Sequence, residues 1–118
     1  MTNSMDPQRE SPFACVMSVI DADKREPHLA NARALFKRIQ ETRELDNGFA
    51  FRLGDSPDLL AKLGEFIALE RLCCPFFGFA IEVEPEGGAV WLKLTGRKGV
   101  KLFIKAEISE ILGVPFGQ

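Results

Sequence analysis

Two alternating runs of apolar residues around a glycine-rich turn limit the fold of this chain more than any other feature. Apolar side chains occupy every second position of residues 77–83 and again of residues 90–94. The turn Pro85-Glu86-Gly87-Gly88 lies between the two runs. Runs with a period of two residues, joined by such a turn, predict an antiparallel β-hairpin with one face toward the core.

Further periodic segments complete the expected order of elements. Residues 13–20 alternate with both sets largely apolar, which predicts a short strand buried on both sides. The other expected elements are, in chain order, a helix over 27–43, a strand over 49–53, a helix over 56–74 and a helix over 100–112. The order βαβαββα predicts an α/β (α+β) fold: a two-layer sandwich with a mixed four-stranded sheet and helices mainly on one face.

Composition and charge exclude several classes of protein. The 118 residues suit one domain, expected over 12–118, after a disordered tail over 1–11. With 15 basic and 17 acidic residues, a net charge of −2 predicts no attraction to nucleic acid or to an anionic membrane. No apolar stretch reaches the length of a membrane span, and the N-terminus lacks the pattern of a signal peptide. Three cysteines make a poor disulfide framework, so we expect free thiols in a reducing, cytoplasmic compartment.

The chemically distinctive segment is Glu70-Arg71-Leu72-Cys73-Cys74-Pro75-Phe76 at the end of the second expected helix. Projection at about 100° per residue puts Glu70 in the middle of the apolar face of that helix. Cys73 and Cys74 stand three and four positions later, so they flank the carboxylate on the same side. The sequence therefore predicts that one carboxylate and two thiols converge toward the core.

A carboxylate on an apolar face is costly unless it is paired or hydrogen-bonded. A neighbouring arginine is the expected partner of Glu70, and Arg71, Arg52, Arg33 or a metal ion must supply positive charge if the cysteines are to ionise. The thiols are not obviously activated nucleophiles, because burial and the negative end of the helix dipole both oppose the thiolate.

Four interpretations of this segment remain open. The cysteines can be small core residues, with Glu70 paired to an arginine. They can form a metal site, in which Glu70, Cys73 and Cys74, joined by Cys15 from the first expected strand, bind zinc or another thiophilic ion. They can act as a thiol redox switch, through a vicinal disulfide or through exchange with Cys15. In the fourth interpretation the protein is an enzyme that uses Glu70 as a general base.

Three other features bear on binding. His28 is the single histidine, and a surface position at the start of the first expected helix is the simplest interpretation. Trp91 falls on the polar face of the hairpin, where an exposed tryptophan indicates a docking surface. Leu69 and Leu72 fall off the apolar stripe of the second expected helix, which favours a homodimer contact.

The cysteine segment resembles the E-R-x-C-C-P-F signature of a family of small uncharacterised bacterial proteins, in which it precedes a hairpin. Asp46-Asn47-Gly48-Phe49-Ala50-Phe51-Arg52 and Leu94-Thr95-Gly96-Arg97-Lys98-Gly99 also look like that family. The resemblance covers roughly residues 13–112. Members are sometimes associated with heavy-metal resistance, so the resemblance implies the fold and adds slightly to the metal interpretation.

The sequence thus favours a thiol-based metal-binding or redox-responsive accessory protein built on Glu70, Cys73 and Cys74. The alternative is a non-catalytic interaction module whose cysteines are structural. Neither composition nor spacing identifies a reaction.

Overall fold

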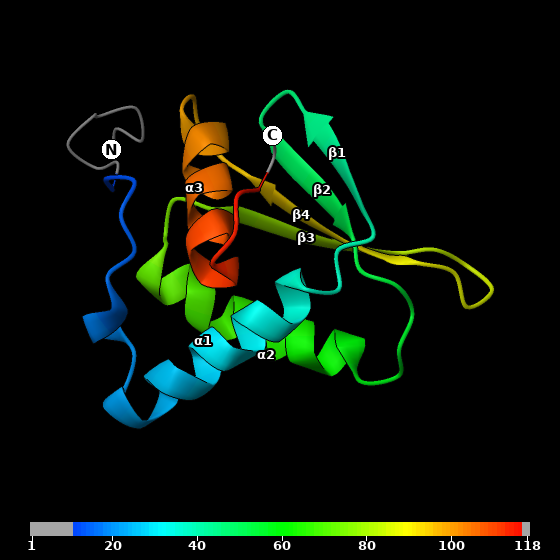
Figure 1. Ribbon diagram of the computed structural model, residues 1–118, viewed down its shortest axis with the longest axis horizontal. Helices are drawn as coiled ribbons and strands as arrows, with labels where there is room; N and C mark the ends of the chain where they lie inside the picture. Colours follow the sequence, from blue (N-terminus) through cyan, green and yellow to red (C-terminus); the bar gives the residue numbers. More distant parts are fainter. Residues whose placement is uncertain (1–10, 117–118) are drawn as a thin grey trace, which may run out of the picture.

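The computed structural model describes residues 11–116, which form a four-stranded sheet packed against three helices (Figure 1). The helices are α1 (Ala22–Phe36), α2 (Leu59–Cys73) and α3 (Val100–Leu112). The strands are β1 (Glu41–Leu45), β2 (Gly48–Arg52), β3 (Gly78–Val83) and β4 (Val90–Thr95), and a short 3-10 turn, η2, covers Met17–Val19. The expected tail over 1–11 lies outside the described residues, apart from Ser11.

The sheet is antiparallel throughout, with strand order β1-β2-β4-β3. The central strand β4 pairs Leu92 with Phe51 of β2 on one side and with Ile81 of β3 on the other. The α+β class, the four strands and the predicted hairpin of β3 and β4 are confirmed. The expected mixed sheet is wrong, because no described pair of strands is parallel.

The strand expected over residues 13–20 is wrong. Cys15 and Met17 do pack toward the core, but Val16 is exposed, and the chain turns into the 3-10 segment η2 at Met17. No strand pairs with this segment, and the backbone N–H of Val16 instead donates to the carbonyl of Cys73 at the end of α2 (2.9 Å). Alternation of apolar residues indicates that one side of the segment is buried, but it does not show that another strand pairs with it.

The fourth strand is β1, which lies where the first helix was expected to continue. Its residues are mostly exposed, so it carries no alternating apolar signal. It forms a tight hairpin with β2, in which Leu45 is the register partner of Gly48. The elements therefore follow the order α1-β1-β2-α2-β3-β4-α3 where βαβαββα was expected.

One large core lies between the helices and one face of the sheet, as the two-layer prediction requires. The largest fully buried side chains there come from both layers: Phe51, Phe66, Ile20, Leu35, Leu59, Leu63, Leu92, Ile104 and Ile108. Within the described residues, no helix is long and apolar enough to cross a membrane.

The opposite face of the sheet holds a small second cluster around Trp91. The guanidinium of Arg43 lies 4.3 Å from the centre of the indole, and the indole N–H donates to Glu84 (3.3 Å). Trp91 is therefore only 5% exposed, and the expected docking surface of exposed tryptophan is wrong. Of the two leucines assigned to a dimer contact, Leu72 is exposed and Leu69 is partly buried; the homodimer stays a prediction.

Strands β2 and β4 approach so closely at Gly48 that no side chain fits at this position. A Cβ atom at this position would overlap the backbone carbonyl oxygen of Leu94, which cannot move without breaking the ladder. We expect Gly48→Ala to lower the free energy of unfolding by about 2 kcal/mol or more, measured by urea denaturation.

Gly64 provides the matched control. It is exposed in the middle of α2, with no atom within 4 Å of an added Cβ. Gly64→Ala should raise the free energy of unfolding by about 0.5–1 kcal/mol through helix propensity. Equal effects of the two substitutions would contradict this account of the sheet.

Candidate functional site

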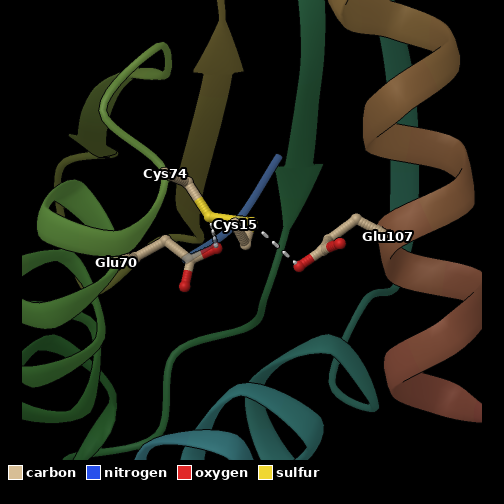
Figure 2. Close-up of side chains that lie close together, drawn as sticks. All are labelled: Cys15, Glu70, Cys74 and Glu107. Carbon is tan, nitrogen blue, oxygen red and sulfur yellow. Dashed lines mark hydrogen bonds between the residues drawn. A yellow bond between two sulfur atoms is a disulfide. The ribbon is translucent and has the colours of Figure 1, made fainter. Parts of the chain in front are cut away.

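A disulfide between Cys15 and Cys74 joins the extended N-terminal segment to the end of α2 (Figure 2). The two residues are 59 positions apart in the sequence, and their Cα atoms are 4.8 Å apart. The backbone hydrogen bond from Val16 to Cys73 holds the two segments side by side next to this bond. Cys74 is fully buried, whereas Cys15 is partly exposed. The expectation of three free thiols is therefore wrong for this pair.

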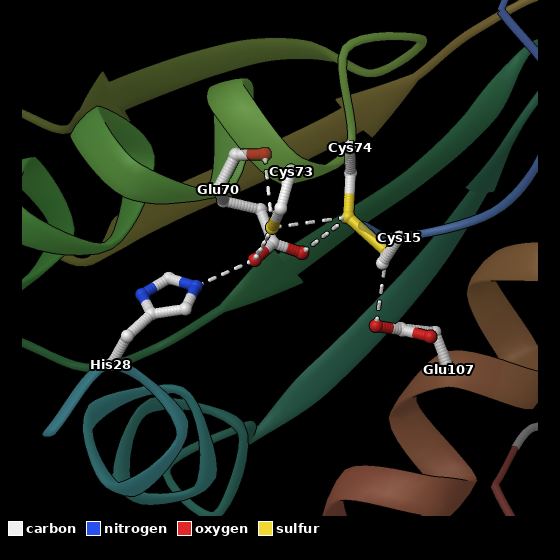
Figure 3. The surroundings of a disulfide bond; sticks show 6 residues. All are labelled: Cys15, His28, Glu70, Cys73, Cys74 and Glu107. Atoms are coloured by element: carbon white, nitrogen blue, oxygen red, sulfur yellow. Dashed lines mark hydrogen bonds and ion pairs between the residues drawn. A yellow bond between two sulfur atoms is a disulfide. The ribbon is translucent and has the colours of Figure 1, made fainter. Parts of the chain in front are cut away.

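Cys73 is the remaining thiol, and it is buried beside the disulfide (Figure 3). Its Sγ lies 3.6 Å from the Sγ of Cys74 and 3.6 Å from the backbone carbonyl oxygen of Glu70. Burial, followed by the negative charge of Glu70, raises the pKa of the Cys73 thiol to about 12. Cys73 is thus a protonated, weakly nucleophilic thiol at neutral pH.

Glu70 faces the core, as the helical projection predicts, and it is 5% exposed. Its partner is His28 of α1, whose Nε2 lies 2.8 Å from Oε1 of the carboxylate. The expectation of an arginine partner is wrong, and so is the surface position expected for His28, which is 3% exposed. The imidazole stacks on Phe66 with ring centres 5.6 Å apart, which fixes its orientation.

The hydrogen of the imidazole belongs on Nε2 in this arrangement. A carboxylate can only accept, so His28 donates to Glu70 through Nε2–H. Among the described residues, the buried Nδ1 of His28 has no hydrogen-bond partner.

The second carboxylate oxygen of Glu70 faces the disulfide. Oε2 lies 3.4 Å from the Sγ of Cys74, while Oε1 is held by His28. One carboxyl group therefore connects the imidazole of α1 with the sulfur at the end of α2.

Glu107 of α3 approaches the other sulfur, with Oε2 3.3 Å from the Sγ of Cys15 (Figure 2). Burial raises the pKa of this carboxyl to about 7, and the negative charges of Glu70 and Glu110 add to the rise. A disulfide sulfur has no hydrogen to donate, so in the oxidised protein the contact is a hydrogen bond only when Glu107 is protonated. Each sulfur of the disulfide thus has a carboxyl group beside it.

The four residues predicted as metal ligands, Glu70, Cys73, Cys74 and Cys15, do lie in one cluster. Their donor atoms fall into two groups, each within 4.8 Å. One group holds Cys15, Glu70, Cys74 and Glu107, and the other holds His28, Glu70 and Cys73. While the disulfide is intact, its two sulfurs are not thiolates, so the first group offers a metal ion only its carboxyl oxygens.

Sequence reasoning missed Glu107 and assigned the wrong environment to His28, although the projection that found Glu70 applies to both. Glu107 lies three positions after Ile104 and four before Ile111, on the apolar side of α3. His28 lies four positions before Ala32 and seven before Leu35, on the buried side of α1. A polar residue on the apolar side was therefore visible within α2 and α3, and at the start of the apolar side of α1.

Comparison of the chain with protein-family models, with curated proteins and with solved structures gives no match. The chemistry of the site must therefore be judged from its own geometry.

The burial of Cys73 predicts its reactivity. In the native oxidised protein at pH 8, we expect no thiol to react with a disulfide reagent such as Ellman's reagent on the timescale of manual mixing. After denaturation one thiol should react, because Cys15 and Cys74 are bonded to each other. Rapid labelling of Cys73 in the folded protein would contradict its burial and raised pKa.

The raised pKa of Glu107 predicts a pH dependence of stability. Between its ordinary pKa of 4.5 and about 7, the folded protein holds a proton that the unfolded chain has released. The stabilisation from this group is complete below about 4.5 and is lost as the pH rises to about 7. Because Glu107 is partly exposed, we expect a loss of only about 1–2 kcal/mol.

Urea denaturation of the oxidised protein between pH 4.5 and 8 measures this loss. Glu107→Gln should flatten the curve relative to the unchanged protein, whereas the exposed Glu110→Gln should leave most of its slope. Identical slopes for the unchanged protein and Glu107→Gln would refute the assignment.

Proposed function

We propose that this protein is a redox-responsive thiol protein whose Cys15–Cys74 disulfide forms and breaks reversibly. One observation carries the proposal: each sulfur of the bond lies within 3.4 Å of an oxygen from a different carboxyl group, Glu107 or Glu70. A disulfide that only ties the chain together does not need a carboxyl group beside each sulfur.

The two sulfurs differ in access, which gives exchange a direction. Cys15 is partly exposed and Cys74 is buried, so we place the attack of an external thiolate at the Sγ of Cys15. Attack there forms a mixed disulfide on Cys15 and releases Cys74 as a thiolate. A second external thiolate then attacks the external sulfur of the mixed disulfide and releases Cys15 as a thiolate.

The complete reduction takes two electrons and two protons. The external dithiol or pair of thiols supplies both electrons and leaves as a disulfide. The thiolate of Cys15 is released next to Glu107, which can pass it a proton when protonated. The thiolate of Cys74 is released next to the carboxylate of Glu70, and its proton comes from solvent, which takes up the protons that the external thiols lose. In the oxidising direction the same carboxyl groups accept the thiol protons.

Reduction should leave the fold intact, because other contacts also hold the N-terminal segment. The ring of Phe13 stacks against Phe103 and meets Phe76 edge-on, and the guanidinium of Arg97 lies 4.2 Å from its centre. Arg97 also donates to the backbone carbonyl of Ser11. A bond that opens without unfolding the domain can act as a switch. In a reducing cytoplasm, the compartment expected from the sequence, most protein disulfides are of this transient kind.

Equilibration with glutathione buffers of increasing reducing power tests the proposal. Acid trapping, alkylation and mass spectrometry count the thiols, while far-UV circular dichroism follows the fold. We expect Cys15 and Cys74 to become reduced together at a midpoint above about −300 mV, with the fold retained. Cys73→Ser is the matched control and should titrate like the unchanged protein. Reduction only on unfolding would refute the switch and favour a structural cysteine pair in an interaction module.

A further inference from the structure

We infer that the reduced cluster binds one thiophilic divalent metal ion through Cys15, Cys74, Glu70 and Glu107, so that the disulfide and the metal exclude each other. The inference rests on the proposed function, because reduction is what creates the ligands. It changes the ligand set expected from the sequence: Glu107 enters and Cys73 leaves.

The donor atoms are already close enough for one ion. One sulfur or oxygen atom from each of the four residues lies within 4.8 Å of the other three. Two thiolate sulfurs and two carboxylate oxygens make a four-coordinate set, which is the number that zinc adopts in closed sites. The two thiolates favour a soft or borderline ion such as Zn²⁺ or Cd²⁺ over Mg²⁺ or Ca²⁺.

The charge of the deprotonated ligand set also requires a cation. Two thiolates next to two carboxylates would gather four negative charges in a largely buried space. Among the described residues, no lysine or arginine forms an ion pair with Glu70 or Glu107. A divalent ion would offset this negative charge, and the two cysteines would lose their thiol protons when they bind it.

His28 serves as a positioning residue in this site. Its Nε2 is 2.8 Å from Oε1 of Glu70, and this bond leaves Oε2 directed at the sulfur of Cys74 (Figure 3). Metal sites commonly hold a ligating carboxylate through such a second hydrogen bond. Cys73 belongs to the other group of donor atoms, because its thiol lies 3.6 Å from the backbone carbonyl oxygen of Glu70 and 3.7 Å from Oε1, the oxygen that His28 holds.

The ligands come from three parts of the fold, so a bound metal ion would hold these parts together, as the disulfide holds two of them. Cys15 lies in the N-terminal segment, Glu70 and Cys74 at the end of α2, and Glu107 on α3. The ion would join all three parts, whereas the disulfide joins only the first two. Oxidation removes both thiolate ligands at once, so it must release the ion.

This inference is tested by titrating the full-length protein with Cd²⁺ in its reduced and in its oxidised form. The readout is the thiolate-to-metal charge-transfer absorbance, and competition with Zn²⁺ confirms that the same site is occupied. We expect one Cd²⁺ per reduced chain and no charge-transfer band in the oxidised chain. Oxidation of the loaded protein should release the ion as the thiols disappear. A thiol count on each sample shows whether Cys15 and Cys74 are reduced.

Variants separate this ligand set from the one expected from the sequence. Glu107→Gln should weaken Cd²⁺ binding roughly tenfold or more, and Glu110→Gln, an exposed position on the same helix, should not change it. Cys73→Ser should keep the stoichiometry and the band, and Cys15→Ser and Cys74→Ser should each lose affinity while circular dichroism confirms that they fold. Loss of binding in Cys73→Ser with full binding in Glu107→Gln would overturn the ligand set. Reduced thiols without a charge-transfer band would overturn the metal site and leave the redox proposal standing.

Discussion

The burial of the Glu70 carboxylate is the constraint from which the rest of the site follows. A charged group removed from water must be matched by hydrogen bonds or opposite charge, and at 5% exposure water cannot provide them. The match comes from His28 of α1, so the pairing of these two side chains also specifies how α1 packs on α2. Phe66 stacks on the imidazole and joins this polar contact to the aromatic core.

The cluster of Cys15, Cys74, Glu70 and Glu107 lies where the N-terminal segment, α2 and α3 meet. This location explains how the disulfide can open without unfolding the domain. Main-chain and aromatic contacts bring Cys15 to Cys74 independently of the bond between them. Glu107 then reaches the sulfur of Cys15 from α3. A cluster assembled from separate elements can gain or lose a disulfide while the sheet and the helices keep their own packing.

Much of the fold followed from periodicity because the relevant signals are local. The hairpin of β3 and β4 and the end of α2 before Pro75 are visible in neighbouring residues, and the structure has both. The same method failed for β1, whose exposed side chains carry no apolar alternation. It also failed for the segment before α1, which contains the 3-10 turn η2, because a period of two residues does not show whether another strand pairs with a segment.

The sequence by itself determined that Glu70, Cys73 and Cys74 share one side of the last turn of α2, because helix geometry relates residues three and four positions apart. It also determined that the carboxylate needs a partner, since burial of an unpaired charge is costly. Only the tertiary structure decided that this partner is His28, that Cys74 rather than Cys73 meets Cys15, and that Glu107 completes the cluster. These contacts join residues 42, 59 and 92 positions apart, and their formation depends on how whole elements pack, which no local pattern encodes.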